Sequence, residues 1–335
     1  MSLTATDLFA GAGGSSTGML DAGIKVRIAA NHWPVAIATH QENHPDTEHD
    51  CADISQVDPR RYPRTELLWA SPSCTHHSRA QGKRRQQGLG LWDRVPETVA
   101  DLIEMEPDRS RATMHDVVRF AEYHRYDAII TENVPEVMDW PLFPYWLAML
   151  TEGLGYHYTP ILLDAADASR SGPAVAQSRL RAYLLFTRTR IAGPAWPRTQ
   201  RLPAADFLDP DPGPELRSKA RAAATLRRVE ATVNRYPGAG RWIVSYYGSS
   251  KVGKPASEPV GTLTTRDRHA VLTDQGGVLH YRMLNRAEQV RLMGFPDTYR
   301  WTGTGTEITK QIGNAVVPAA ARDLVTVVAE SLGAA

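Results

Sequence analysis

The chain opens with a short apolar segment that runs directly into a glycine-rich turn. Thr4 to Phe9 has the composition of a buried strand, Gly11-Ala12-Gly13-Gly14 follows it, and Ser15 to Ala22 is patterned as a helix. Glycines at such a turn adopt positive φ readily and let the backbone approach a ligand closely. Ligands of open α/β sheets bind at the carboxyl ends of the strands. The opening segment therefore predicts an α/β sheet with a nucleotide-type site at its first strand.

The same alternating pattern continues to residue 190. Further strands are expected at 25–30, 66–70, 127–131, 157–163 and 182–188, and helices at 35–42, 113–123 and 146–152. Strands that alternate with helices indicate a parallel α/β sheet. A nicotinamide-binding version of this fold would need a third glycine where Ser16 stands, which disfavours an oxidoreductase.

The character of the sequence changes after residue 190. Residues 192–214 are rich in proline, 218–236 read as a basic helix, and 242–272 are rich in the small and β-branched residues of short strands and loops. Helical patterning returns at Asn285, where Glu288 completes a capping-box pattern, and a last helix begins near Pro318. We therefore expect one domain built from 1–190 and 281–335, and a smaller domain at 191–280.

Composition excludes several classes of protein. Of the 335 residues, 42% are hydrophobic and 22% charged, which is ordinary for a globular protein and excludes wholesale disorder. No run approaches the length of a membrane span, and the first residues lack the basic and apolar regions of a signal peptide. The two cysteines, Cys51 and Cys74, fit a reducing compartment. We expect a cytoplasmic protein.

The distribution of charge says more than its sum. The net charge is +1, from 38 basic and 37 acidic residues, but 79–94, 177–201 and 214–241 are all strongly basic. One basic stretch alone is ordinarily a solvated helix face. Three that border the motifs described below favour a surface that binds a polyanion.

Reactive side chains follow the predicted strands. Cys74 lies just after 66–70, and Glu132 directly follows 127–131. Arg179 and Arg181 lie in the segment that enters the last strand of the series. A cysteine at the carboxyl end of a parallel strand is placed to act as a nucleophile, although taken alone it is equally often an inert small side chain. A metal site is disfavoured because its candidate ligands lack regular spacing; these are His49, Cys51, Cys74, His76 and His77.

Five blocks stand in the order found in cytosine-5 DNA methyltransferases of bacteria and phages, a family that the chain resembles from Asp7 to Val317. The blocks are 7–14, the segment around Cys74, Glu132–Val134, Gln177–Arg181 and Gln311–Val317, and 291–297 matches as well. The resemblance implies a Rossmann-like methyltransferase sheet with helices on both faces. It also implies that 191–280 is a target-recognition domain of irregular and β structure.

The same resemblance implies S-adenosylmethionine as the methyl donor and no metal. Phe9 and Trp33 would pack on the adenine, and Asp53 would accept a hydrogen bond from its amino group. Residues expected at the donor are Phe9, Ala10, Gly11, Gly13, Gly14, His32, Trp33, Asp53, Ile54 and Asn314. The family usually has an acid where His32 stands and a proline where Ser73 stands, so the ribose contact and the backbone before Cys74 stay open.

The implied chemistry assigns a role to each reactive side chain. Cys74 would add to carbon 6 of cytosine, Glu132 would protonate or hydrogen-bond ring nitrogen 3, and Arg179 and Arg181 would hold the base. Because the target carbon is inaccessible inside a duplex, the base would be flipped out. Residues expected to contact DNA are Arg79, Gln81, Lys83, Arg84 and Arg85 in a loop over the flipped base, and Arg266 and Arg268 in the smaller domain.

Other readings stay open. A branch of the same family methylates transfer RNA, but the insert of roughly 90 residues at 191–280 favours double-stranded DNA. A binding module without chemistry is disfavoured by the intact Cys74, Glu132 and Arg181. We expect a monomer associated with the nucleoid, with a cognate restriction endonuclease as one possible partner. The target sequence, and whether the enzyme serves restriction, phage protection or regulation, do not follow from the sequence.

Overall fold

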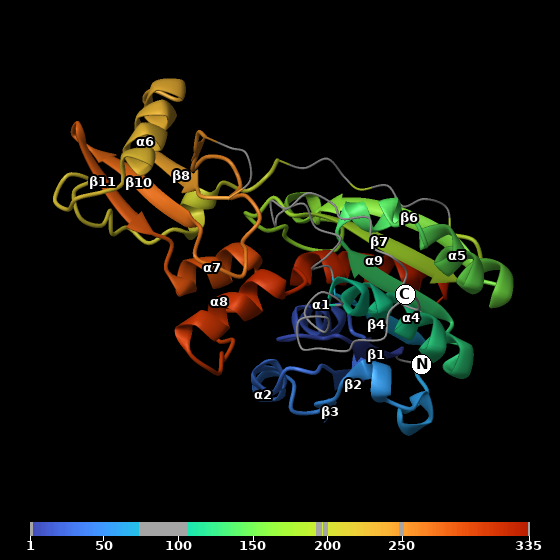
Figure 1. Cartoon of the computed structure of the whole chain (residues 1–335). Helices are drawn as coiled ribbons and strands as arrows, with labels where there is room; N and C mark the ends of the chain where they lie inside the picture. The colour runs from blue at the N-terminus through green and yellow to red at the C-terminus, as the bar shows by residue number, and fades with distance from the viewer. Residues whose placement is uncertain (1–2, 74–105, 192–195, 197–199, 248–250, 334–335) are drawn as a thin grey trace, which may run out of the picture.

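The computed structural model describes residues 3–73, 106–191, 196, 200–247 and 251–333. Its larger sheet runs in the order β3-β2-β1-β4-β5-β7-β6 (Figure 1). The strands are β1 Thr4–Leu8, β2 Lys25–Ala30, β3 Glu48–Asp50, β4 Leu67–Ala70, β5 Ala128–Asn133, β6 His157–Asp164 and β7 Leu180–Thr187. The predicted α/β architecture is confirmed.

One strand differs from the parallel sheet that the alternation predicts. β7 pairs antiparallel with both β5 and β6, whereas the pairs β1–β2, β1–β4, β2–β3 and β4–β5 are parallel. The connection from Asp164 to Leu180 contains one 3₁₀ turn, Ala165–Asp167, and no crossover helix. The chain therefore turns back at the same end of the sheet and enters β7 antiparallel to β6, since a parallel β7 would need a crossover connection.

Helices cover both faces of this sheet. They are α1 Gly14–Asp21, α2 Pro34–Asn43, α4 Glu106–His124, α5 Phe143–Ala148 with a π-helical continuation Met149–Gly153, and α9 Pro318–Ser331. The position of β4 explains why all its residues are apolar. Leu67 and Trp69 belong to the core beneath α1 and α9. Leu68 and Ala70 belong to the core on the other face, beneath α4 and α5. A strand buried on both faces has no polar side to alternate with.

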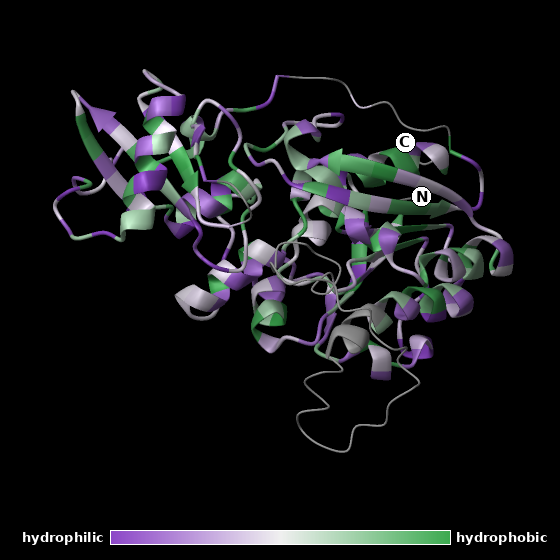
Figure 2. Cartoon of the chain, turned by 45° about the horizontal axis from the view of Figure 1, so that its top comes forward, coloured by the Kyte–Doolittle hydropathy of each residue, from purple (hydrophilic) through white to green (hydrophobic). Residues whose placement is uncertain are grey.

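A smaller antiparallel sheet lies beside the larger one in Figure 1, with the order β11-β10-β8-β9. Its strands are β8 Arg241–Ser245, β9 Lys254–Pro255, β10 His269–Gln275 and β11 Val278–Met283, and α6 Ala223–Arg235 packs on β8. Because β11 runs to Met283, this sheet extends past residue 280, where we expected the smaller domain to end. Figure 2 shows hydrophobic residues along the strands of both sheets and hydrophilic residues along their connections.

Two more helices connect the sheets. α7 Arg286–Met293 begins with the capping box predicted at Asn285 and Glu288, and α8 Gly305–Asn314 begins with a second capping box at Thr304 and Glu307. By length and composition, the stretch Gly305–Ser331 is the one part of the described chain that would suffice to cross a membrane. However, 83% of its apolar window is buried inside the fold, as in a core helix.

The first and last helices approach one another through small residues. A Cβ built on Gly14 would collide with the carbonyl oxygen of Val316, and one on Gly18 would lie 2.7 Å from both the Cβ of Ala321 and the backbone nitrogen of Arg322. Glycine is therefore required at these two positions if α1 and α9 are to keep this separation. The contact joins the first and last family blocks, which are about 300 residues apart in the chain.

We expect Gly18→Ala to lower the free energy of unfolding by about 1–3 kcal/mol, because the added methyl over-packs a rigid backbone contact. Urea denaturation followed by far-ultraviolet circular dichroism measures the change. Gly153→Ala is the matched control, since the nearest atom to its Cβ would lie 3.9 Å away. Equal stability of both variants would contradict the packing argument.

Candidate active site

The glycine turn lies at the carboxyl end of β1. Phe9 has φ 60°, Gly11 has φ 56° and Gly13 has φ 98°, and the nitrogen of Gly13 donates to the carbonyl of Ala10 at 3.0 Å. A left-handed phenylalanine is uncommon and marks a backbone that its surroundings hold in place. A Cβ on Gly11 would meet no atom within 4 Å, whereas Gly13 and Gly14 are closed in by neighbours. The turn therefore presents its Gly11 side to open space, as a ligand-binding turn must.

The neighbouring strands bring other residues that the sequence predicts at the methyl donor to the same edge of the sheet. Asn31 follows β2, and its side-chain oxygen accepts from the nitrogen of Trp33 at 2.9 Å, which fixes the entry into α2. Asp53 follows β3 and caps a 3₁₀ turn that starts at Ile54, accepting from the nitrogen of Ser55 at 3.1 Å. His32 and Asp53 are both exposed.

The last family block approaches this group from α8. The ammonium of Lys310 lies 4.5 Å from the centroid of the Trp33 ring, and Asn314 is one helical turn further along α8. Both side chains are exposed. Sequence reasoning named Asn314 but missed Lys310. The available signal was its spacing of four residues from Asn314, which places the two on one helix face.

A buried polar cluster supports the turn from behind. Asp7 is fully buried, and its carboxylate accepts from the hydroxyls of Ser15 at 2.6 Å and Ser16 at 2.7 Å. Burial raises the pKa of Asp7 to about 7, although the two hydroxyls oppose the shift. His40 lies 2.9 Å from the Ser16 hydroxyl, and burial holds the pKa of His40 well below its usual range. Burial therefore favours the uncharged forms of both Asp7 and His40 in this cluster.

The raised pKa of Asp7 has a defined effect on stability. Because the fold binds this proton more tightly than the unfolded chain, its contribution is complete below pH 4 and is lost as the pH rises through 7. We expect Asp7→Asn to gain about 2–4 kcal/mol of unfolding free energy relative to the natural chain between pH 4 and pH 7. Taking the difference between the two proteins removes the contributions of histidines common to both. A difference in unfolding free energy between the two proteins that stays the same from pH 4 to pH 7 would contradict the assignment.

Glu132 and Arg181 form an ion pair at the carboxyl end of β5. Arg181 Nε lies 3.1 Å from Glu132 Oε1, and each side chain is 12% exposed. β7 brings Arg181 there because its antiparallel register places Tyr183 opposite Glu132. The pair is thus mostly shielded from solvent but still accessible to a ligand at the surface, and its opposite charges compensate one another.

The backbone that leads to Cys74 is fastened beside this pair. The carbonyl of Pro72 accepts from the Asn133 side chain at 3.3 Å, and the nitrogen of Ser73 donates to the Thr113 hydroxyl at 3.1 Å. On the other side, the nitrogen of Ser71 donates to the carbonyl of Leu8 at 3.1 Å, just before the glycine turn. The segment entering Cys74 therefore lies between the turn and Glu132. Cys74 itself lies outside the described residues.

Arg179 contacts different partners from Arg181. It is buried, and its two terminal nitrogens donate to the carbonyls of Leu263 at 3.2 Å and Gly313 at 3.1 Å. Gln177 adds a bond to the nitrogen of Leu263 at 2.9 Å. Arg179 thus attaches the Leu263 backbone, in the connection between β9 and β10, to the end of α8, and Gln177 attaches it to the segment before β7. That both arginines hold the base stays a prediction.

The predicted DNA-contacting residues are only partly described. Arg266 is exposed and Arg268 half-buried, in the loop before β10. Asp267 between them accepts from Gln289 at 2.9 Å and from the Thr309 hydroxyl at 3.3 Å, which fixes the loop above α7 and α8. The remaining candidates lie outside the described residues: Arg79, Gln81, Lys83, Arg84 and Arg85.

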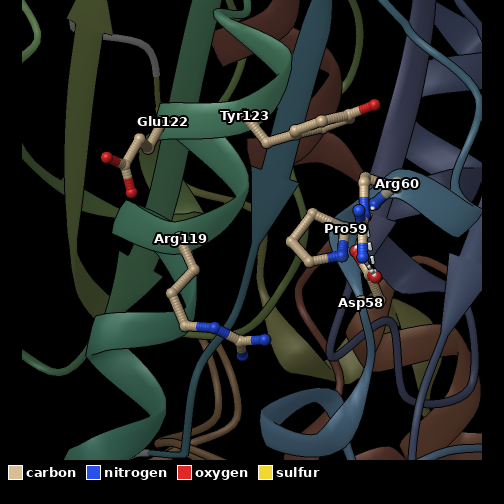
Figure 3. Close-up of a pocket in the computed structure, with 6 residues that line it drawn as sticks. All are labelled: Asp58, Pro59, Arg60, Arg119, Glu122 and Tyr123. Carbon is tan, nitrogen blue, oxygen red and sulfur yellow. Dashed lines mark hydrogen bonds and ion pairs between the residues drawn. The ribbon is translucent and has the colours of Figure 1, made fainter.

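A surface hollow of about 500 Å³ lies elsewhere, between α4 and the 3₁₀ turn Pro59–Arg61 (Figure 3). Its lining residues are Asp58, Pro59, Arg60, Arg119, Glu122 and Tyr123. Asp58 and Arg60 pair with one another at 2.5 Å, and none of the residues expected at the donor or the base belongs to it. Among the described residues, no group of three or more histidine, cysteine or acidic side chains is arranged to hold a metal ion.

Residues 3–330 match the C-5 cytosine-specific DNA methylases. The chain belongs to this family. The family resemblance drawn from the sequence blocks is thereby confirmed, and the chain is a DNA cytosine-5 methyltransferase. Its family uses S-adenosylmethionine as methyl donor.

Bacterial relatives extend over nearly the full chain. Type II methyltransferase M.HgiDI of Herpetosiphon aurantiacus is 27% identical over 92% of this chain and 89% of its own length. Type II methyltransferase M.NlaX of Neisseria lactamica is 26% identical over 92% of this chain and 91% of its own length.

Solved structures share the fold of this methyltransferase. A DNA modification methyltransferase encoded within an E. coli prophage superposes with a TM-score of 0.65 at 19% identity, covering 99% of this chain and 100% of the other. The S. pombe Dnmt2 methyltransferase gives a TM-score of 0.65 at 15% identity, covering 99% of each chain. At these identities the likeness concerns the fold alone.

Proposed function

We propose that the chain methylates carbon 5 of a cytosine flipped out of double-stranded DNA, with Cys74 as nucleophile and Glu132 as acid. The observation that carries the proposal is the position of the 71–73 backbone. It is bonded to Leu8 before the glycine turn and to Asn133 next to Glu132. A thiol just beyond it would lie within reach of both a donor at the turn and a base at Glu132.

The Cys74 thiolate would add to carbon 6 of the ring, forming a C–S bond and shifting electron density toward carbon 5. Glu132 would give a proton to, or hydrogen-bond with, ring nitrogen 3, which relieves the negative charge of the adduct. Arg181, paired with Glu132 at 3.1 Å, would orient that carboxyl. Carbon 5 would then accept the methyl group, and the sulfur of the donor would keep the electron pair of the broken bond. Loss of the carbon 5 proton to a base, which water can supply, would let the C–S bond to Cys74 break, and the proton on nitrogen 3 would return to Glu132.

S-adenosylmethionine, when bound, supplies a sulfonium-activated methyl group. The open side of Gly11 supports its placement along the turn. Phe9 and Trp33 would hold the adenine, while Ala10, Gly13, Gly14 and Ile54 would shape the pocket. Asp53 would accept from the adenine amino group, and Asn314 would complete the site. His32 offers no carboxylate for the ribose hydroxyls, so the neighbouring Lys310 is the more suitable polar partner on this side.

DNA would lie across the edge between the two sheets. Arg266 and Arg268 would contact it from the smaller domain, 191–280, and the loop with Arg79, Gln81, Lys83, Arg84 and Arg85 would cover the flipped base. The Type II relatives favour a bacterial cytoplasmic enzyme that protects DNA beside a cognate restriction endonuclease. The enzyme would act as a monomer.

A covalent trap tests the reaction. Bisulfite sequencing of plasmid DNA from cells that express the chain identifies the methylated motif. A duplex carrying 5-fluorocytosine in that motif should then form an adduct that survives denaturing electrophoresis, since fluorine cannot leave carbon 5 as the proton does. We expect Cys74→Ser to form none. Methyl transfer to transfer RNA but not to duplex DNA would refute the proposal.

The role of Glu132 is separable from donor binding. Glu132→Gln removes the transferable proton, so we expect single-turnover methyl transfer to slow by about 10²–10⁴-fold, while the Kd for S-adenosylmethionine changes less than about twofold. Glu136→Gln, the same substitution four residues further along, should leave both quantities near their natural values. Equal losses of chemistry and donor affinity in Glu132→Gln would argue against its role as an acid.

A further inference from the structure

The block 291–297 has no role in the reaction described above, yet its continuation lies against the glycine turn. α7 ends at Met293 and is capped by Gly294, which has φ 78°. The ring centroids of Phe295, Tyr299 and Trp301 then lie 4.7–5.2 Å apart. A Cβ on Gly14 would lie 3.3 Å from the Phe295 ring, and one on Gly13 would lie 2.6 Å from the Tyr299 hydroxyl. We call Phe295–Thr302 the brace.

Tyr299 is hydrogen-bonded to the turn itself. Its buried hydroxyl donates to the carbonyl of Ala12. Behind the turn, the Thr17 hydroxyl donates to the carbonyl of Gly13 at 2.8 Å. His44 Nε2 lies 3.3 Å from both of these hydroxyl oxygens.

Counting the hydrogen-bond donors around His44 determines its tautomer. Tyr299 and Thr17 have each given their only proton to a backbone carbonyl, so His44 Nε2 must carry the hydrogen and donate to them. The neutral imidazole suits this role, and burial lowers the pKa of His44 to about 4. The result is a directional set of bonds from His44 through Tyr299 to Ala12.

The far end of the brace is attached to α2, which begins just after Trp33. The Thr302 hydroxyl donates to the carbonyl of Val35 at 3.1 Å, and the nitrogen of Thr302 donates to the Thr39 hydroxyl at 3.0 Å. Arg300 adds a backbone bond to the Asn43 side chain at 2.9 Å. One short segment thus contacts both walls of the donor site, the glycine turn and the start of α2.

We infer that the brace holds the glycine turn in its donor-binding shape, with Tyr299 and His44 as positioning residues for S-adenosylmethionine. The inference rests on the donor site of the proposed function. Neither side chain faces the open side of Gly11, so each acts on the donor through the backbone of residues 12 and 13. Loss of either hydrogen bond lets the turn adopt other conformations. The affinity for S-adenosylmethionine then falls in proportion to the fraction of molecules that keep the binding-competent conformation.

Tyr299→Phe removes one hydroxyl and keeps the ring. Because a buried hydrogen bond contributes about fivefold to tenfold in an equilibrium constant, we expect the Kd for S-adenosylmethionine, measured by isothermal titration calorimetry, to rise by about that factor. The Kd for duplex DNA should be unchanged.

Tyr156→Phe is the matched control. Tyr156 is also buried, donates to a backbone carbonyl, that of Tyr126 at 2.7 Å, and accepts from a cationic side chain, Arg188 at 2.8 Å. It should lose comparable thermal stability and keep its donor affinity. A natural donor Kd in Tyr299→Phe, or an equal rise in both variants, would overturn the inference.

A second pair of variants tests His44 independently. His44→Gln retains an N–H near the position of Nε2 and should keep donor affinity within about twofold, whereas His44→Leu should lose about as much as Tyr299→Phe. Equal affinities of the Gln and Leu variants would refute the hydrogen-bonding role. Failure of the natural chain to bind S-adenosylmethionine at all would instead refute the proposed function.

Discussion

The whole arrangement depends on the close backbone approach between the glycine turn and the residues that precede α9. Gly14 faces the carbonyl of Val316, and Gly18 faces Pro318 and Ala321. This contact brings together two ends of the chain that the sheet alone would leave apart. α8 lies just before this contact in the chain, and its Lys310 ammonium is 4.5 Å from the centroid of the Trp33 ring at the start of α2. The proposed donor site is therefore a product of helix packing as much as of local sequence.

Electrostatics divides the sheet edge into two different environments. Behind the glycine turn, Asp7, His40 and His44 are buried, and burial shifts the pKa of each group toward its uncharged form, which suits a rigid support. At the end of β5, Glu132 and Arg181 stay paired and slightly exposed, which suits a group that must meet a substrate. Both environments follow from where each strand ends and from the direction of β7, whose start delivers Arg181 to the edge.

The sequence predicted the parts of the fold that carry periodic apolar residues. The strand at 25–30 has its predicted bounds, and the capping box at Asn285 forms as expected. β3 was missed because Glu48–Asp50 is short and polar, and α8 because its start is rich in glycine and threonine. The antiparallel direction of β7 depends on the connection from Asp164, which local patterns do not reveal. The contacts of the brace are tertiary, so local patterns do not reveal them. Lys310 shares a helix face with Asn314, but its contact with Trp33 is tertiary as well.

The bonds of Arg179 have a consequence for protein engineering. Its guanidinium joins the backbone at Leu263 to that at Gly313, and Gln177 adds a second attachment at Leu263. A chimera that imports the small sheet from a relative should therefore exchange it in two pieces, one that ends before residue 260 and one that starts after residue 268, so that residues 260–265 stay native. Cutting inside that stretch would leave a buried cation facing foreign backbone, and the graft would fail for reasons unrelated to the DNA motif it was meant to read.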